Sequence, residues 1–229
     1  MSNVKSLFIT ATGTDVGKTY ISALIVKKMR DFGFNCGYYK PVLSGAIKSG
    51  NNLIPGDCKH VVDVAGLNVE PMECLSYCFE DAVSPHLAAI RTGVDINLNK
   101  IKSDYDNLLS KYDYMLIEGA GGITCPIKFN GGDVYLLSDL VKEMNFGTIV
   151  VADGGLGTIN SVLTTVEYMN NQKIKINGII LNNFDKDNYM HQDNLSMVEK
   201  LTGIRVVATV SNGCIDLDIE KHVLEGLYE

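Results

Sequence analysis

Residues 10–19 carry side chains whose types and spacing could bind phosphate. They read Thr-Ala-Thr-Gly-Thr-Asp-Val-Gly-Lys-Thr, and small residues of this kind let the backbone direct several N–H groups at one anion. A helix that opens near Lys18 would add the positive end of its dipole. Lys18 would then reach the terminal phosphates of a nucleoside triphosphate, and the Thr19 hydroxyl would bind Mg²⁺. The motif is imperfect, because Thr12 stands where Gly-x-x-x-x-Gly-Lys-Thr has its first glycine.

The flanking residues favour a phosphate-binding loop over an ordinary strand-to-helix turn. An apolar run at 7–9 precedes the loop, and after it apolar residues recur at helical spacing from Ile21 to Met29. Strand, loop and helix in this order are the setting that such a loop needs. The sequence therefore predicts a nucleoside triphosphate site.

Three charged residues stand where they could act on bound phosphate. Lys40 follows a predicted strand and could neutralise a transferred phosphoryl group, although a solvated lysine is the alternative. Asp57 opens a predicted helix, where it is either a helix-capping carboxylate or a ligand to Mg²⁺. Glu118 ends a buried apolar strand and precedes glycines, which suits a second metal-binding acid. Together with Thr19, these carboxylates predict an oxygen-rich Mg²⁺ site.

The elements that must position these residues alternate regularly along the chain. Predicted strands cover 6–10, 35–39, 114–118, 148–152, 178–181 and 205–209, with a weaker one at 75–77. Predicted helices cover 18–32, 57–65, 85–92, 98–111, 135–144, 159–170, 190–202 and 218–226. The pattern predicts an α/β fold of the P-loop NTPase type, one domain over residues 1–229 with a mainly parallel sheet and helices on both faces. Residues 44–56 are the one long loop expected before mid-chain.

Composition and charge exclude several classes of partner. The chain has 229 residues and a net charge of −7, which argues against nucleic acid and anionic membrane surfaces and favours small molecules. The N-terminus lacks the features of a signal peptide, and no apolar run approaches membrane-spanning length, so we expect a cytoplasmic protein. The six cysteines have no metal-binding spacing and are expected to be reduced.

Several short motifs resemble one enzyme family when they are taken in order. They are Thr-Asp-Val-Gly-Lys-Thr at 14–19, Tyr-Lys-Pro-Val-Leu-Ser-Gly at 39–45, Ser-Pro-His at 84–86 and Glu-Gly-Ala-Gly-Gly at 118–122. In this order and spacing the chain resembles the dethiobiotin synthetases over nearly its whole length. Ser84 and Pro85 also read as a helix start, so we expect no catalytic role for His86.

The resemblance implies an ATP- and Mg²⁺-dependent ligase of biotin biosynthesis. In this family CO₂ adds to one amine of 7,8-diaminopelargonic acid, ATP phosphorylates the carbamate, and the second amine displaces phosphate to close the cyclic urea of dethiobiotin. The implied catalytic residues are Lys40 and Lys18, and the implied metal-site residues are Thr19, Asp57 and Glu118. The implied nucleotide-binding residues are Asp15, Val16, Gly17, Lys18, Thr19, Tyr20, Asp57, Glu118, Gly119, Ala120, Gly121, Asn182, Asn183, Ser211, Asn212 and Gly213.

The resemblance also implies a homodimer. In the family, the segment that matches residues 155–160 comes from the partner subunit and holds the carboxylate tail of the substrate, as a helix N-terminus can. The implied substrate-binding residues are Ser44, Thr14, Leu156, Gly157, Thr158 and Asn160. The alternative for residues 155–160 is a plain strand-to-helix turn.

Some positions depart from the family pattern. Ala11 replaces a usual glycine, Gly13 an aspartate, and Asp15 a common glutamate, which bears on the shape of the loop more than on its charge. Asn183 stands where the family often has aspartate. Residues 182–185, Asn-Asn-Phe-Asp, match only half of the guanine motif Asn-Lys-x-Asp, which favours ATP over GTP.

Other function classes share such a loop. Partition-type ATPases, which act as dimeric switches, carry a signature lysine at the position that Gly13 occupies here. A regulatory module without ligase activity could dispense with Lys40 or Ser44, and both are present. Ligases that amidate corrin rings normally bring a glutaminase domain, for which the chain has no room. We therefore favour the diamine ligase.

Overall fold

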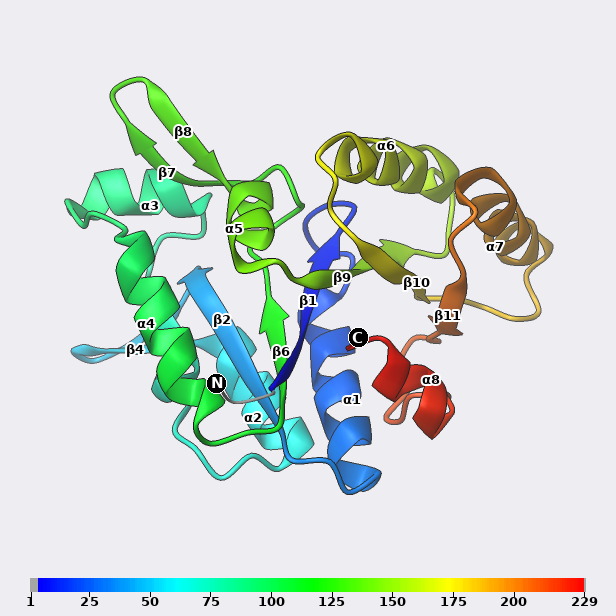
Figure 1. Cartoon of the computed structure of the whole chain (residues 1–229), viewed down its shortest axis with the longest axis horizontal. Helices are drawn as coiled ribbons and strands as arrows, with labels where there is room; N and C mark the ends of the chain where they lie inside the picture. The colour runs from blue at the N-terminus through cyan, green and yellow to red at the C-terminus, as the bar shows by residue number, and fades with distance from the viewer. Residues whose placement is uncertain (1–3, 229) are drawn as a thin grey trace.

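A single seven-stranded parallel sheet forms the centre of the molecule. In the computed structural model, which describes residues 4–228, the strands follow the order β11-β10-β9-β1-β6-β2-β5 (Figure 1). They are β1 (Lys5–Ala11), β2 (Cys36–Ser44), β5 (Leu75–Phe79), β6 (Tyr114–Glu118), β9 (Gly147–Asp153), β10 (Ile176–Asn182) and β11 (Val206–Thr209). The central strands read as continuous apolar runs because helices cover both of their faces.

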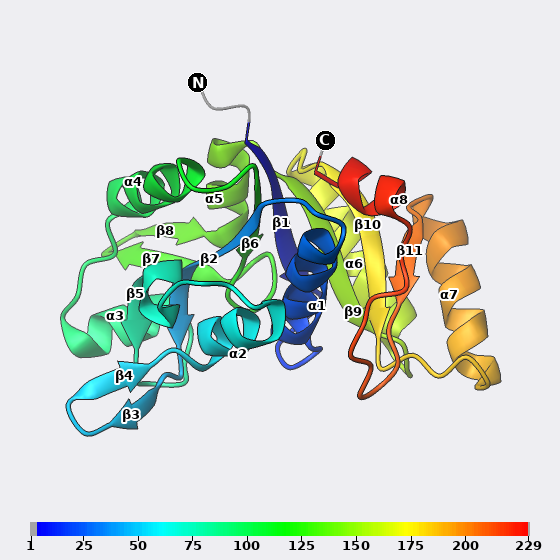
Figure 2. The ribbon, with the colours of Figure 1, turned by 90° about the horizontal axis from the view of Figure 1, so that it is seen from below.

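Helices divide between the two faces of the sheet. They are α1 (Lys18–Asp31), α2 (Gly56–Ala65), α3 (Pro85–Thr92), α4 (Leu98–Leu109), α5 (Leu137–Met144), α6 (Thr158–Asn171), α7 (Tyr189–Thr202) and α8 (Lys221–Gly226), with a short 3₁₀ helix, η1 (Pro71–Cys74). Helices α1, α2 and α8 share one hydrophobic core with the sheet, and α3 to α7 share the other. Figure 2 shows α1, α2 and α8 in front of the strands.

Side chains in the middle of β2 alternate between these two cores. Tyr38 packs into the core under α1 and α2, whereas Tyr39 packs into the opposite core. Strand β2 pairs with β6 so that Tyr38 lies opposite Leu116. Lys40 and Glu118, each two residues further along its strand, therefore point to the same face as α1 and α2.

The predicted fold class is confirmed, and each predicted strand and helix coincides with an observed one. The sequence reading missed two β-hairpins, one formed by β3 (Ile47–Ser49) and β4 (Asn52–Ile54), the other by β7 (Pro126–Asn130) and β8 (Asp133–Leu136). The first lies inside the predicted loop, and β8 takes the start of the predicted helix 135–144. These strands are short, and all three residues of β3 are exposed, so the sequence has no buried apolar run from which they could be predicted.

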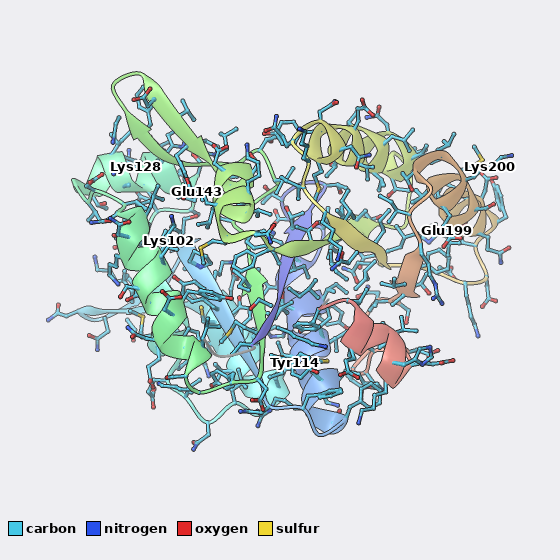
Figure 3. All side chains as sticks on the ribbon, viewed as in Figure 1. Lys102, Tyr114, Lys128, Glu143, Glu199 and Lys200 are labelled. Atoms are coloured by element: carbon cyan, nitrogen blue, oxygen red, sulfur yellow. The ribbon has the colours of Figure 1, made fainter. Side chains whose placement is uncertain are left out.

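Packing rather than surface charge holds the layers together. Lys102 of α4 and Glu143 of α5 form an ion pair at 2.6 Å (Figure 3), but both side chains are more than one-third exposed. Such a pair contributes little to stability. Within residues 4–228, the helices are all too short or too polar to span a lipid bilayer.

Candidate functional site

The loop between β1 and α1 has the backbone of a phosphate-binding loop. Gly17, at the N-cap of α1, has a φ of 88°, in the left-handed region that favours glycine. A Cβ atom there would lie 2.1 Å from the side-chain amide of Asn182, so the close approach also requires glycine. That same amide donates to the Val16 carbonyl oxygen at 3.0 Å and ties the loop to the end of β10.

Lys40 lies between two carboxylates beside this loop. Its Nζ atom is 2.5 Å from Asp57 Oδ2 and 2.7 Å from Glu118 Oε1. Thr19 donates its hydroxyl to the same Oε1 at 2.7 Å. Glu118 is fully buried and Lys40 is 4 % exposed, so neither is a solvated surface charge. The side chain of Asp57 pairs with Lys40, and the N-cap of α2 is Pro55, so the capping alternative is not the arrangement found.

Burial and charge shift the pKa values of these groups in opposite directions. Burial alone would raise the pKa of Glu118, but the ammonium groups of Lys40 and Lys18, with hydrogen bonds from Lys40 and Thr19, lower it to about 2. Burial alone would lower the pKa of Lys40, and the two carboxylates outweigh it and raise that pKa above its ordinary value. For Lys18 burial prevails, and its pKa is lowered.

The donor set beside Lys40 fits Mg²⁺. The carboxylates of Asp57 and Glu118 both accept from Lys40 Nζ, and the Thr19 hydroxyl donates to the same Glu118 oxygen, so three oxygen-bearing side chains lie together. Mg²⁺ prefers such oxygen ligands and usually takes only one or two carboxylates, with water and phosphate oxygens completing its shell. Among residues 4–228 no cluster of three or more histidine, cysteine or acidic residues competes as a metal site.

A cleft of about 810 Å³ opens above this cluster. It is large enough for a nucleotide and a small second substrate, given that ligand cavities commonly measure roughly 300–1,000 Å³. Of the predicted site residues it contacts Thr14, Asp15, Gly17, Lys18, Thr19, Tyr20, Lys40, Ser44, Asp57, Ala120 and Gly121. The remaining predicted residues are not among those that line it.

The predicted carboxylate-binding segment does not line the cleft of its own chain. Gly157 caps α6, with Leu156 92 % exposed before it and Asn160 exposed in the first turn. Thr158 is buried, and its hydroxyl has no partner among the described residues. The segment thus has a helix N-terminus without a side-chain cap and an exposed apolar side chain beside it.

The predicted base-binding residues do not line the cleft themselves. Asn182 is buried, and its Oδ1 atom has no hydrogen-bond partner within residues 4–228. Asn183 is exposed and donates to Asp153. Tyr20 donates its hydroxyl to the Cys214 carbonyl and so links the cleft to the loop of Ser211, Asn212 and Gly213, all of which are exposed.

Sequence reasoning missed several residues of the site. Ala82, Val83, Ser84 and Pro85, together with Cys125, line the cleft. Ser84 is at the N-cap of α3 as expected, but its hydroxyl makes no capping bond. Tyr38 donates its hydroxyl to Glu118 Oε2 at 2.9 Å. In the sequence, only its position two residues before Lys40 points to Tyr38, and this does not identify Glu118 as its hydrogen-bond partner.

Comparison with known proteins decides the family. A model of the AAA domain family matches residues 5–213. The ATP-dependent dethiobiotin synthetase of Brachyspira hyodysenteriae is 45 % identical over 225 residues, which cover 98 % of this chain and 99 % of that protein. The synthetase of the same name from Clostridium perfringens (strain 13 / Type A) is 47 % identical over 225 residues, 98 % of this chain and 97 % of that one. The chain belongs to the dethiobiotin synthetase family. As a member of this family it is a ligase, and the predicted enzyme class is confirmed.

Solved structures outside the dethiobiotin synthetase family share the fold alone. The MinC:MinD cell division protein complex of Aquifex aeolicus matches with a TM-score of 0.54 at 12 % identity, covering 98 % of this chain and 86 % of that one. A ParA family ATPase from Chlorobium tepidum matches with a TM-score of 0.54 at 14 % identity, covering 97 % and 88 %. At such identities the likeness confirms a P-loop NTPase-like α/β fold and carries no functional argument.

Proposed function

We propose that this chain forms dethiobiotin from 7,8-diaminopelargonic acid, CO₂ and ATP. The observation that supports this most directly is the buried cluster in which Lys40 joins Asp57 and Glu118 beside Lys18 and the phosphate-binding loop. Relatives that match almost the whole chain are dethiobiotin synthetases by name, in agreement with that chemistry.

The reaction proceeds in three bond-forming steps. One amine nitrogen of the diamine attacks CO₂ and loses a proton, which gives a carbamate. A carbamate oxygen then attacks the γ-phosphorus of ATP, the bond to the β-phosphate oxygen breaks, and ADP leaves. Finally the second amine attacks the carbamate carbon, the C–O bond breaks, phosphate leaves, and a proton is lost as the cyclic urea closes.

The residues of the cluster offset the repulsion between anions in the middle step. Lys18, at the opening of α1, binds the β- and γ-phosphates, together with the backbone N–H groups of the loop. Lys40 presents its ammonium to the carbamate and the transferred phosphoryl group. Thr19, Asp57 and Glu118 would hold Mg²⁺, which when bound would neutralise charge on the phosphate oxygens. The two lysines and two acids sum to no net charge, so Mg²⁺ would supply the net positive charge that offsets part of the charge of the triphosphate.

The two substrates occupy different parts of the site. In this proposal the diamine fits beside Ser44, Thr14 and Ser84, which line the cleft. The adenine lies towards the end of β10, where Asn182 contacts the phosphate-binding loop and Tyr20 contacts the segment that follows residues 211–213. Gly119, Ala120 and Gly121 follow Glu118 and allow close approach to phosphate.

The working form in this proposal is a homodimer in the cytoplasm. Leu156, Gly157, Thr158 and Asn160 do not line the cleft of their own chain, and the N-terminus of α6 is free to bind the substrate carboxylate in the partner's cleft. Mixed dimers test this: Lys40→Met and Asn160→Asp chains are each inactive alone. When mixed, they regain about one-quarter of the activity, because one of the two sites in a mixed dimer has no substitution. Failure to regain activity, with dimers verified by light scattering, would contradict shared sites.

The decisive experiment follows phosphate release and product. Purified protein is supplied with ATP, Mg²⁺ and bicarbonate, with and without the diamine, and dethiobiotin is detected by mass spectrometry. Phosphate release that depends on the diamine, with dethiobiotin formed in equal amount, is the expected result. ATP hydrolysis that ignores the diamine would refute the ligase and favour a nucleotide switch.

A further inference from the structure

Glu118 makes two different kinds of contact through its two carboxylate oxygens. Oε1 accepts hydrogen bonds from Thr19 at 2.7 Å and from Lys40 at 2.7 Å, on the side that faces the cleft residues. Oε2 accepts from Tyr38 at 2.9 Å, on the side that faces the core. A fully buried carboxylate thus has one oxygen in the reactive cluster and one anchored away from it.

Tyr38 is suited to this anchoring by its place on β2. Its ring is 1 % exposed and packs in the core under α1 and α2, so the hydroxyl has little freedom to move. Strand β2 lies beside β6 in parallel register, with Tyr38 opposite Leu116, two residues before Glu118. The hydroxyl bonds the oxygen that Thr19 and Lys40 do not contact, and Tyr38 does not line the cleft. Removing the hydroxyl leaves Oε2 without a hydrogen-bond donor among residues 4–228.

We propose that Tyr38 is a positioning residue that fixes the orientation of the Glu118 carboxylate for the metal site. The inference rests on the proposed role of Glu118 as a Mg²⁺ residue. Outer residues that hydrogen-bond a metal ligand fix its orientation, and their loss typically weakens metal affinity by about 10- to 100-fold. With the hydroxyl present, Oε1 stays directed at Thr19 and Lys40, which is the side on which the metal would bind. Without it, the carboxylate can rotate and loses that direction.

The test measures Mn²⁺, as a substitute for Mg²⁺, bound in the presence of ADP, with free Mn²⁺ followed by electron paramagnetic resonance. Tyr38→Phe removes one oxygen and keeps the ring; we expect Mn²⁺ affinity to fall by about 10-fold or more. Tyr39→Phe is the matched control. It makes the same change one residue along the same strand, where the hydroxyl contacts Ser76 and the Ile101 carbonyl in the opposite core. We expect its Mn²⁺ affinity to stay within about twofold of the unchanged protein.

A double-mutant cycle separates positioning from general stability. In a Glu118→Gln background, Tyr38→Phe should cause little further loss of Mn²⁺ affinity, because the carboxylate it orients is gone. Equal losses in both backgrounds, or an unchanged affinity in Tyr38→Phe, would overturn the inference. Should Tyr38→Phe fail to fold by circular dichroism, Tyr38→Met is judged by the same criteria.

Mn²⁺ binding by the unchanged protein tests the metal site of the proposed function separately from the role of Tyr38. If that protein binds no Mn²⁺ with ADP, the metal site itself is refuted. If it binds Mn²⁺ and Tyr38→Phe binds it equally well, only the role of Tyr38 is refuted. In steady-state assays the Mg²⁺ concentration for half-maximal rate should rise in Tyr38→Phe while kcat at saturating Mg²⁺ changes little, a split that a damaged fold would not give.

Discussion

Replacing Lys40 by methionine should destabilise the protein in a way that depends on pH. Methionine keeps most of the side-chain volume but leaves Glu118 buried without its main cation. The pKa of Glu118 lies at about 2 against an ordinary value of 4.5. At roughly 1.4 kcal/mol per pH unit, this difference corresponds to about 3 kcal/mol of stability at pH 7. Lys18 supplies part of the effect and remains, so we expect the variant to lose about 2 to 3 kcal/mol.

The sign of the pH dependence follows from the lowered pKa. A carboxylate whose pKa is lower when folded contributes its full stability above pH 4.5, and that contribution fades as the pH falls towards 2. The gap in unfolding free energy between the unchanged protein and Lys40→Met should therefore be widest near pH 7 and narrow towards pH 3. Urea unfolding followed by circular dichroism at several pH values measures it.

A surface lysine provides the control for this experiment. Lys59 pairs with Asp63 at 2.7 Å on α2, but both side chains are more than half exposed. Lys59→Met should therefore cost less than about 0.5 kcal/mol at any of these pH values. A gap for Lys40→Met that is below about 1 kcal/mol at pH 7, the range of exposed pairs, would refute the reasoning. So would a gap that does not change between pH 7 and pH 3.

Three further changes probe the phosphate-binding loop. Lys18→Ala should weaken ADP binding about 10- to 100-fold, measured by calorimetry, because it removes a charged hydrogen-bond donor to phosphate; unchanged affinity would contradict the assignment of the loop. Gly17→Ala should lower both the melting temperature and ADP affinity more than Gly33→Ala, since both glycines have a φ near 88° but only at Gly17 does a Cβ meet a neighbour. Asn182→Ala should cost about 1 kcal/mol of stability in urea unfolding by leaving the Val16 carbonyl unpaired; no measurable loss would contradict this role of the amide.

Local sequence signals were sufficient for the elements but not for the contacts between them. The phosphate-binding loop could be predicted because the strand, the small residues and the helix are consecutive. Glu118 ends β6 as predicted, but the prediction that Lys40 follows a strand was wrong, because β2 continues to Ser44 and Lys40 lies in its middle. The burial of both charges depends on the pairing of β2 with β6, and the two residues are 78 positions apart in the chain. Tyr38 and its partner are likewise 80 residues apart, and nothing local distinguishes Tyr38 from Tyr39.

Short exposed strands were the second feature that could not be predicted from the sequence. The β3–β4 hairpin has little buried apolar surface, so its residues carry no periodic signal. The role that we propose for residues 155–160 needs a second copy of the chain, which no pattern within one chain can position.

The alternation of side chains along β2 also favours one register between β2 and β6. If β2 slipped by one residue against β6, Lys40 would enter the apolar core beneath α3 to α7, where the buried side chains are almost entirely hydrophobic. An ammonium group without a partner there would cost several kcal/mol. In that slip Tyr39 would take the place of Tyr38, which is the same residue, so the lysine is what disfavours the wrong alignment. The charge of Lys40 thus also favours the correct register of β2 during folding. A neutral residue at position 40 should increase the fraction of chains in which β2 pairs with β6 out of register.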